Sequence, residues 1–473
     1  MKKISIFLLA IISSITLSCD KDFEEVNTDP NNPQVVPAHL LLANTIRQTQ
    51  NATYNIQQGG DMGLCWAQHW SKVQYNSEEQ YIPRRGAIDN VWDVLYSGVI
   101  YDAKVMNALA TKEGNTNLEA ISLVMQANAF QILTDLYGPV PFSEAGIKGN
   151  LKPKYNSQQE VYTGILAMLT KADGLLTSDS GDVPSTSDLV YAGDVSKWRK
   201  LANSLKLKAL IRISKASGIN NAADIQSLVS AGNLMTSNSD SALIYNLDAG
   251  STDANPIYQG LDGRLEYKVS SVLVDEMETL DDPRLEVFAK PVGSSFVGNV
   301  PGVESLNYSG TSAIGAFYNN KTLPGVILSY AQVEFLLAEA ANEGFISGGN
   351  TEAVSHFNKG IESNFLFNGL TSADATTYSS QPSLQFATTP SGRVIIGTQV
   401  WLALYGQGFE AWTEWRRTGV PALLPVANAA IPSIPSRLYY AVNEASVNQS
   451  NYSAAVSTLT GGDKLTSRLW FMN

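Results

Sequence analysis

The sequence predicts a mostly α-helical domain, in which a scaffold of tetratricopeptide-like helical hairpins carries a loop-rich, minor-β half suited to binding a ligand. Long segments with apolar residues at helical spacing hold small residues, such as Ala103, Ala127 and Gly164, where paired helices would touch. The stretch 233–328 is instead rich in Gly, Ser, Asn and Pro, and such long loops usually form a functional face. With 473 residues, 44% of them hydrophobic, the chain can form one large domain, which we assign to residues 39–473.

The chain opens with features of an export signal. Lys2 and Lys3 precede an apolar run, Ile4–Leu17, that is too short to cross a bilayer. This pattern predicts a cleaved leader over residues 1–18.

A cysteine follows the leader directly. Ser18-Cys19 resembles a bacterial lipobox, although Thr16 stands where a Leu is usual, and it predicts that Cys19 is lipidated and begins the mature chain. The alternative is a plain secretory leader with an incidental cysteine. The acidic run Asp20–Glu25 resembles the surface-export signal of some Gram-negative outer-membrane lipoproteins. We therefore expect residues 19–38 to form a turn-rich tether on a lipid anchor, facing the cell exterior.

Helical periodicity dominates the first half of the domain. We expect Gly59 and Gly60 to interrupt the first helix, and Gly138–Pro141 to stop the third, because proline cannot continue a helix. The helices predicted here cover residues 39–58, 88–110, 118–137, 158–176, 195–217 and 222–231.

The periodicity weakens after residue 232 and returns later. The run Ala242–Leu247 is strand-like, and a short helix is expected at Val272–Leu280. The chain after Val420 is again rich in proline and loops. Further helices are predicted at 329–342, 351–364 and 398–418.

The last of these helices carries an aromatic stripe. Its members recur at i, i+4, i+8, i+11 and i+15, which places on one face Trp401, Tyr405, Phe409, Trp412 and Arg416. The stripe is either a sugar-stacking platform or the spine of a core, and burial is favoured because apolar helix faces usually pack. Gly406 and Gly408 indicate that another element lies close to this backbone. We expect Arg416 to pair with a buried Glu334 or Glu339.

Charge and cysteine content exclude several classes of partner. The net charge of −12 becomes −14 once Lys2 and Lys3 leave with the leader, and no basic patch is present, so nucleic acid is not expected to bind. Anionic headgroups would repel such a chain, and membrane attachment therefore requires the lipid. If Cys19 is lipidated, Cys65 has no disulfide partner, and its apolar setting predicts a packed thiol.

The sequence shows no catalytic, metal-binding or cofactor-binding motif. It lacks a nucleophile elbow, a His-Glu-x-x-His motif, a Cys-x-x-Cys motif and a phosphate-binding loop, and it has three histidines. A glycosidase needs two suitably spaced carboxylates, and Glu334 and Glu339 are candidates, although pairing with arginine or capping of backbone is favoured for both. We predict no catalytic residues, no metal and no cofactor.

Ligand capture without chemistry needs flat rings beside polar side chains, because sugar faces stack on aromatic rings and sugar hydroxyls form hydrogen bonds. Two loop-rich stretches supply both, and the residues nominated from them are Trp66, Trp70, Tyr75, Arg84, Tyr258, Arg264, Asn307 and Tyr308. Core packing is an equal alternative for Trp66, Trp70 and Tyr75, since the two tryptophans are spaced i, i+4 as in a buried helical turn.

Several stretches together resemble the SusD-like (SusD/RagB) family, in its second large branch. Two of the longest are Leu133-Thr-Asp-Leu-Tyr-Gly-Pro-Val-Pro-Phe-Ser-Glu-Ala145 and Gly406-Gln-Gly-Phe-Glu-Ala-Trp-Thr-Glu-Trp-Arg-Arg417. The others are 27–33, 191–198, 203–207, 282–285 and 329–340. They follow one another along almost the whole mature chain, with Ala192 and Leu201 as minor departures.

The resemblance implies a nutrient-binding outer-membrane lipoprotein that acts as a lid over a TonB-dependent (SusC-like) transporter. The ligand it implies is an oligosaccharide, or a peptide in some members, bound without cleavage. It transfers no binding residue, because the shared motifs belong to the scaffold. Two alternatives stay open from the residues alone, a helical glycoside hydrolase and a scaffold that binds only protein.

Overall fold

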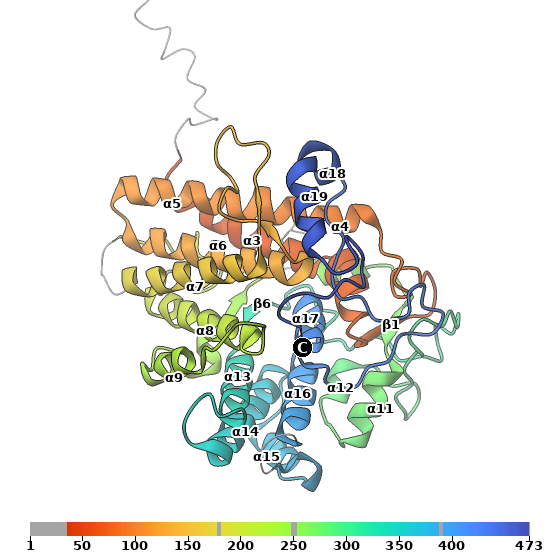
Figure 1. Ribbon diagram of the computed structural model, residues 1–473. Helices are drawn as coiled ribbons and strands as arrows, with labels where there is room; N and C mark the ends of the chain where they lie inside the picture. Colours follow the sequence, from red (N-terminus) through yellow and green to blue (C-terminus); the bar gives the residue numbers. More distant parts are fainter. Residues whose placement is uncertain (1–35, 177–180, 247–252, 387–390, 473) are drawn as a thin grey trace, which may run out of the picture.

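The computed structural model describes residues 36–176, 181–246, 253–386 and 391–472 (Figure 1). Helices adjacent in sequence pack against each other in one half of the molecule, where α5, α6, α7 and α8 follow as successive rows and α13 and α14 form a further pair. The bounds are α3 (Leu40–Tyr54), α4 (Arg85–Asp93), α5 (Tyr101–Glu113), α6 (Thr116–Tyr137), α7 (Gln158–Leu175), α8 (Val195–Ile213), α9 (Ala222–Ser230), α13 (Tyr330–Asn342) and α14 (Gly349–Phe367). This arrangement confirms the helical-hairpin scaffold.

Local sequence sets the ends of these helices. The Asn115 side chain accepts from Leu118 N at 3.0 Å at the start of α6, and Ser157 and Glu160 form a capping box on α7. Within α7 a Cβ on Gly164 would lie 2.1 Å from the Phe142 ring, so only glycine allows this approach. The small residue thus occupies a packing contact, as expected.

The other half of the molecule contains short elements and long connections. Its helices are α10 (Pro256–Leu261), α11 (Ser271–Thr279) and α12 (Leu285–Phe288). Three two-stranded antiparallel sheets occur among the described residues, β1 (Trp70–Lys72) with β5 (Tyr267–Val269), β2 (Val140–Pro141) with β3 (Tyr155–Asn156), and β4 (Ala242–Ile244) with β6 (Gly325–Leu328). The loop-rich, minor-β half is therefore confirmed, including the strand expected near Ala242.

Two expected helices differ in detail near the N-terminus. The first ends at Asn55, whose extended backbone starts the π-helical η1 (Ile56–Leu64), and Gly59 and Gly60 lie inside η1 instead of breaking the helix. A Cβ on Gly59 would lie 2.0 Å from Thr53 O, so this glycine permits the tight turn from α3 into η1. The second, predicted at 88–110, is a continuous run of α4, the π-helical η2 (Val94–Ile100) and α5.

The helix predicted at 398–418 is two helices, α16 (Ser391–Ala403) and α17 (Gly408–Thr418). Gly406 between them has φ +86°, a left-handed conformation that favours glycine and turns the chain. We call this unit the α16–α17 elbow. The sequence prediction also missed α10, α12, α15 (Ser372–Ser379), α18 (Glu444–Val447), α19 (Gln449–Thr458) and the single turns η3 (Asn238–Asp240) and η4 (Pro382–Leu384).

The expected close backbone approach at the elbow is confirmed. A Cβ on Gly408 would lie 2.0 Å from Gly59 O, and one on Gly63 would lie 2.4 Å from the carbonyl carbon of Gly408. The approaching element is η1, so two glycine-bearing segments far apart in sequence meet backbone to backbone.

The aromatic stripe is buried, which confirms core packing over a sugar platform. Trp401 Nε1 donates to Ala67 O at 2.8 Å, and Trp412 Nε1 donates to Pro435 O at 2.9 Å. The Tyr405 ring stacks on Phe288 with centroids 4.1 Å apart. No helix of the described part is long and apolar enough to cross a bilayer.

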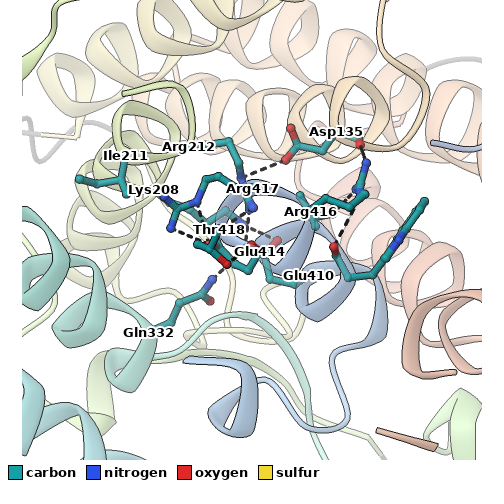
Figure 2. A network of polar contacts seen from close by, with 12 residues as sticks. Asp135, Lys208, Ile211, Arg212, Gln332, Glu410, Glu414, Arg416, Arg417 and Thr418 are labelled. Atoms are coloured by element: carbon teal, nitrogen blue, oxygen red, sulfur yellow. Dashed lines mark hydrogen bonds and ion pairs between the residues drawn. The ribbon is translucent and has the colours of Figure 1, made fainter. Parts of the chain in front are cut away.

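The elbow also organises a buried network of charges (Figure 2). Arg212 of α8 reaches three carboxylates, Asp135 at 3.4 Å, Glu410 at 2.7 Å and Glu414 at 2.8 Å. Burial alone would raise the pKa of Glu410, but Arg212 and Lys208 outweigh burial and lower it to about 2. Oppositely charged side chains therefore compensate the charges buried at the elbow.

The prediction that Arg416 pairs with a carboxylate is wrong. Its guanidinium donates to the carbonyl oxygens of Asp135 at 2.7 Å and Ser436 at 2.8 Å. Asp135 lies in the last turn of α6, and the residue four positions on is Pro139, which has no N–H to offer that carbonyl. Arg416 thus caps the C-terminal end of α6, a role that the pattern of charges along the sequence does not reveal.

The two glutamates proposed for Arg416 have other partners. Glu339 is held by Arg417, with two N–O distances of 2.6 Å, and Glu334 lies 2.5 Å from His356 Nδ1. The pairing expected for Glu339 with an arginine is confirmed, while Glu334 pairs with a histidine.

Candidate ligand-binding face

Three loop segments meet beside the β1–β5 sheet and form what we call the loop face, residues 73–84, 262–266 and 304–310. Val73 N donates to Glu266 O at 2.9 Å, and Leu306 N donates to Val73 O at 3.0 Å. Lys268 Nζ donates to Tyr308 O at 2.7 Å. Backbone hydrogen bonds therefore bring together segments separated by more than two hundred residues of chain.

The loop face presents rings and aliphatic side chains to solvent. Tyr75 is 62% exposed, Leu265 is 68% exposed and Leu306 is 56% exposed. Tyr75 and Leu306 both have positive φ, 60° and 53°, a backbone conformation that residues other than glycine and asparagine seldom adopt. Both residues thus combine an uncommon backbone conformation with an exposed side chain, and such conformations are common at functional sites.

A chain of charges runs from the loop face into the core. Arg84 Nε lies 2.5 Å from Glu78 Oε1, and Glu78 Oε2 lies 3.3 Å from Lys72 Nζ. Lys72 is buried and also lies 3.2 Å from Asp61, whose other contact is the Tyr267 hydroxyl at 2.7 Å. The Arg84 side chain is 48% exposed, so a fixed base of ion pairs supports a guanidinium that reaches solvent.

A buried glutamate anchors the first loop of this face. Glu79 Oε2 accepts from Lys72 N at 3.0 Å and Asn76 Nδ2 at 3.2 Å. Burial raises the pKa of Glu79 to about 7. Next to it, Gln80 Nε2 donates to Gly302 O at 2.8 Å and ties the first loop to the chain just before the third segment.

The structure separates the nominated tryptophans from solvent. Trp66 and Trp70 are 0% exposed. Trp66 Nε1 donates to Glu78 O at 2.8 Å, and Trp70 Nε1 donates to the Tyr405 hydroxyl at 2.9 Å. The core-packing alternative therefore holds for these two rings, and they support the loop face from beneath. Regular i, i+4 spacing was the signal of burial.

Most other nominated residues lie on or beside the loop face. Arg264 is exposed and its Nη1 lies 3.2 Å from Glu266 Oε1. Asn307 is exposed and its Oδ1 accepts from Gly310 N at 3.0 Å. Tyr308 is half-buried, and its hydroxyl hydrogen-bonds to Gln74 Oε1. Tyr258 stands apart on α10, and among the described residues no hydrogen bond or ring contact joins its side chain to this group.

Sequence reasoning missed four contributors to the loop face. Gln74 and Lys268 position Tyr308, and Leu265 and Leu306 add exposed apolar surface. A sequence signal was available for the two leucines, because each is a single Leu inside a polar run, next to Arg264 in one case and next to Asn307 in the other.

The side chains of the loop face suit the binding of a ligand. The face supplies phenol rings, guanidinium donors and amide groups, which are the partners that sugar rings and hydroxyls use. No cluster of three or more potential metal ligands occurs within the described ranges. Cys65 is free and buried, as expected, and burial raises the pKa of its thiol; Cys19 lies outside the described residues.

Comparison with known proteins identifies the fold family. The SusD-like_2 family model, described as "Starch-binding associating with outer membrane", matches residues 30–441. The chain belongs to the SusD-like family. No curated protein matches it.

Solved structures of SusD-like proteins agree over nearly the whole chain. A chitin-binding protein is 27% identical, with a TM-score of 0.82 over 92% of this chain and 99% of its own. A SusD homologue from Bacteroides fragilis NCTC 9343 is 25% identical, with a TM-score of 0.78 over 92% and 99% of the two chains. A SusD-like protein from Bacteroides thetaiotaomicron VPI-5482 is 25% identical, with a TM-score of 0.79 over the same shares. This chain therefore spans nearly the full length of these solved structures.

Proposed function

We propose that this SusD-like protein is a surface-exposed outer-membrane lipoprotein that binds oligosaccharide at the loop face and passes it to a partner TonB-dependent transporter. One observation carries the binding proposal. The exposed Tyr75 ring and the Tyr308 ring project from segments that hydrogen bonds fix to one another, beside the guanidinium groups of Arg84 and Arg264.

The chemistry of the loop face favours a neutral or weakly polar glycan. Arg84 and Arg264 are each paired with a glutamate, so they offer N–H donors without a net positive field. Exposed rings and aliphatic side chains suit the C–H faces of sugars. The 27% identical structure is named a chitin-binding protein, which makes N-acetylated glycans the first ligands to test. Peptides remain the second class, because the same groups accept a peptide backbone.

Affinity electrophoresis tests the ligand class directly. We expect the purified protein to be retarded in gels that contain one or more soluble polysaccharides, including glycol chitin and starch, with a peptide pool assayed in parallel. The double variant Tyr75→Ala/Tyr308→Ala should migrate as if no polysaccharide were present. Tyr245→Ala is the matched control, because Tyr245 is 59% exposed on a different segment. Retardation that survives the double variant would contradict a loop-face site.

We propose that binding occurs without catalysis, with no metal or other cofactor. Incubation of the protein with the retained polysaccharide should release no reducing sugar. Release that disappears on replacing a specific pair of carboxylates would instead establish the glycoside hydrolase alternative.

The anchor and the transporter need separate tests. The Cys19→Ala chain should leave the membrane fraction and become soluble in the periplasm, and palmitate labelling of the natural chain should be lost. A tagged natural chain should co-purify with a TonB-dependent transporter from outer membranes of the source cells. Recovery without any transporter would favour a role as a free binding protein.

A further inference from the structure

A second exposed feature lies away from the loop face, in the connection between β2 and β3, which we call the 142–154 loop. In Figure 1 it projects at the upper edge of the view above α5, whereas β1 and the loop face lie at the right. The antiparallel pairing of Val140 with Asn156 closes its base. Nothing in the proposed glycan site uses this loop.

Side chains from other elements hold the loop backbone. Lys104 Nζ of α5 donates to Ala145 O at 2.5 Å. From the opposite side, Asn448 Nδ2 donates to Pro153 O at 2.8 Å and Asn451 Nδ2 donates to Lys152 O at 2.9 Å. The loop is therefore a braced projection with a defined outer surface.

That outer surface combines aliphatic and cationic side chains. Leu151 is 79% exposed and Ile147 is 52% exposed, although isoleucine and leucine are usually buried. Lys148, Lys152 and Lys154 are exposed between and beside them, with Glu144 as the acidic residue of the loop. A chain with a net charge of −12 thus places three lysines within one short apolar projection.

We propose that the 142–154 loop inserts its aliphatic side chains into an anionic lipid surface while its lysines contact the phosphate headgroups. Exposed aliphatic residues flanked by lysine are the combination that binds at a membrane interface. The acidity of the rest of the chain does not prevent this, because charges more than about 8 Å away are screened at physiological salt.

The start of the described chain contacts the same helix, α5, as the 142–154 loop. Ala38 N donates to Glu113 Oε1 at 3.0 Å at the end of α5, and the loop contacts Lys104 near the start of that helix. Lys104 and Glu113 are nine residues apart on α5, so these two points are separated by about 14 Å along the helix. The 17 residue-to-residue steps from Cys19 to Val36 can span at most about 58 Å, so a lipidated Cys19 and the loop can reach one bilayer together.

The loop would act as a second, weak membrane contact that supplements the lipid. Exposed lysines beside aliphatic side chains add to the membrane affinity that a lipid anchor gives. Each lysine near an anionic surface strengthens binding about fivefold, so three together contribute roughly 100-fold. The proposal does not depend on the identity of the glycan.

Vesicle sedimentation of the mature chain from Asp20, which carries no lipid, isolates the loop contribution. We expect binding to vesicles of phosphatidylglycerol and phosphatidylcholine in equal parts, and none to phosphatidylcholine alone. Lys148→Gln/Lys152→Gln/Lys154→Gln should weaken binding by roughly 100-fold. Ile147→Ser/Leu151→Ser should abolish salt-resistant binding. Lys359→Gln/Val394→Ser is the matched control, since both residues are exposed on α14 and α16 at the other end of Figure 1.

Several outcomes would overturn the proposal. They are absence of binding to the anionic vesicles, equal losses in the loop and control variants, or displacement of the protein by glycerol phosphate in solution, which would indicate a free phosphate site. Loop variants that bind vesicles normally but no longer co-purify with a transporter would assign the loop to a protein contact instead. Glycan retardation by the same variants is measured alongside and should be unchanged, so failure of the lipid contact and failure of the glycan site are distinguishable.

Discussion

The α16–α17 elbow and the loop face are both rich in aromatic and arginine side chains, yet they use them in opposite ways. At the elbow, Trp401, Tyr405 and Trp412 are almost fully buried. On the loop face, Tyr75 reaches solvent from a residue with positive φ. The rings that recur at helical spacing pack into the core, whereas the Tyr75 ring, which follows no such spacing, is presented outward. The most conspicuous aromatic motif is therefore the scaffold, and the less regular one is the candidate site.

The arginines show the same difference. The Arg212 side chain is 0% exposed and contacts three carboxylates, so its charge is fully compensated by fixed partners. Arg84 and Arg264 each contact one glutamate and are 48% and 38% exposed, which leaves N–H groups directed at solvent. Complete pairing indicates structure, and partial pairing at the surface leaves capacity for a ligand.

The largest expected effect comes from breaking the elbow network. Arg212→Met leaves Asp135, Glu410 and Glu414 buried without their shared cation and should lower the free energy of unfolding by about 4 kcal/mol. Urea unfolding followed by circular dichroism measures this change. Arg393→Met is the control, because Arg393 pairs with Glu343 at the surface with 45% of its side chain exposed and should lose less than about 1 kcal/mol. Equal losses in the two variants would mean that the buried network contributes no more to stability than a surface ion pair.

Acid should weaken the elbow through His69, whose ring is fully buried 4.7 Å from Trp401. Burial lowers the pKa of His69 from 6.5 to about 3. The unfolded chain therefore binds a proton near pH 6.5 while the folded chain resists it, so stability is lost as the pH falls below 6.5. At about pH 4 the loss should reach about 3 kcal/mol.

Comparison of the natural chain with His69→Leu isolates this contribution. Protonation of Glu410 also destabilises the fold below its unfolded pKa of 4.5. This loss of stability occurs in both chains and therefore cancels in the difference between them. The stability difference between the two chains should depend on pH between 6.5 and about 4. A constant difference would show that His69 is hydrated or paired in solution.

Much of the scaffold could be predicted from the sequence because helix periodicity and caps are local. The helices from α6 to α9, and α13, begin and end close to their predicted residues. The turn at Gly406 could not be predicted, since the aromatic stripe continues through it in phase. The partners of Arg416 were equally hidden, because they are backbone carbonyls from α6 and from the loop at Ser436. Neither belongs to a charge pattern.

The candidate site was less accessible to sequence reasoning. Tyr75, Arg84, Arg264 and Tyr308 come from three segments that meet only through tertiary hydrogen bonds, so no spacing rule links them. The nomination of rings by composition included Trp66, which hydrogen-bonds beneath the same loops and is buried. Exposure, which distinguishes the two cases, depends on packing across the whole chain.

A smaller effect is expected where η1 meets the elbow. Gly408→Ala places a Cβ 2.0 Å from Gly59 O, and because backbone on both sides must move we expect a loss of about 2 kcal/mol. Gly86→Ala is the control, since a Cβ there has no neighbour within 4 Å and lies in helix α4, where alanine should stabilise by about 0.5 kcal/mol. Thermal unfolding of both variants measures the difference, and a neutral Gly408→Ala would show that η1 is loosely packed on the elbow.

The smallest effect on stability is expected on the loop face. Tyr75→Ala removes a ring that is mostly in water and should change the free energy of unfolding by less than about 0.5 kcal/mol. Trp66→Ala, one layer below, should lose about 4 kcal/mol because it deletes a fully buried side chain. Chemical denaturation gives both values, and gel retardation by the retained polysaccharide gives the binding outcome. If Tyr75→Ala lowers the stability of the fold, this ring has a structural role. If the variant is as stable as the natural chain and no longer binds polysaccharide, the ligand binds at the loop face.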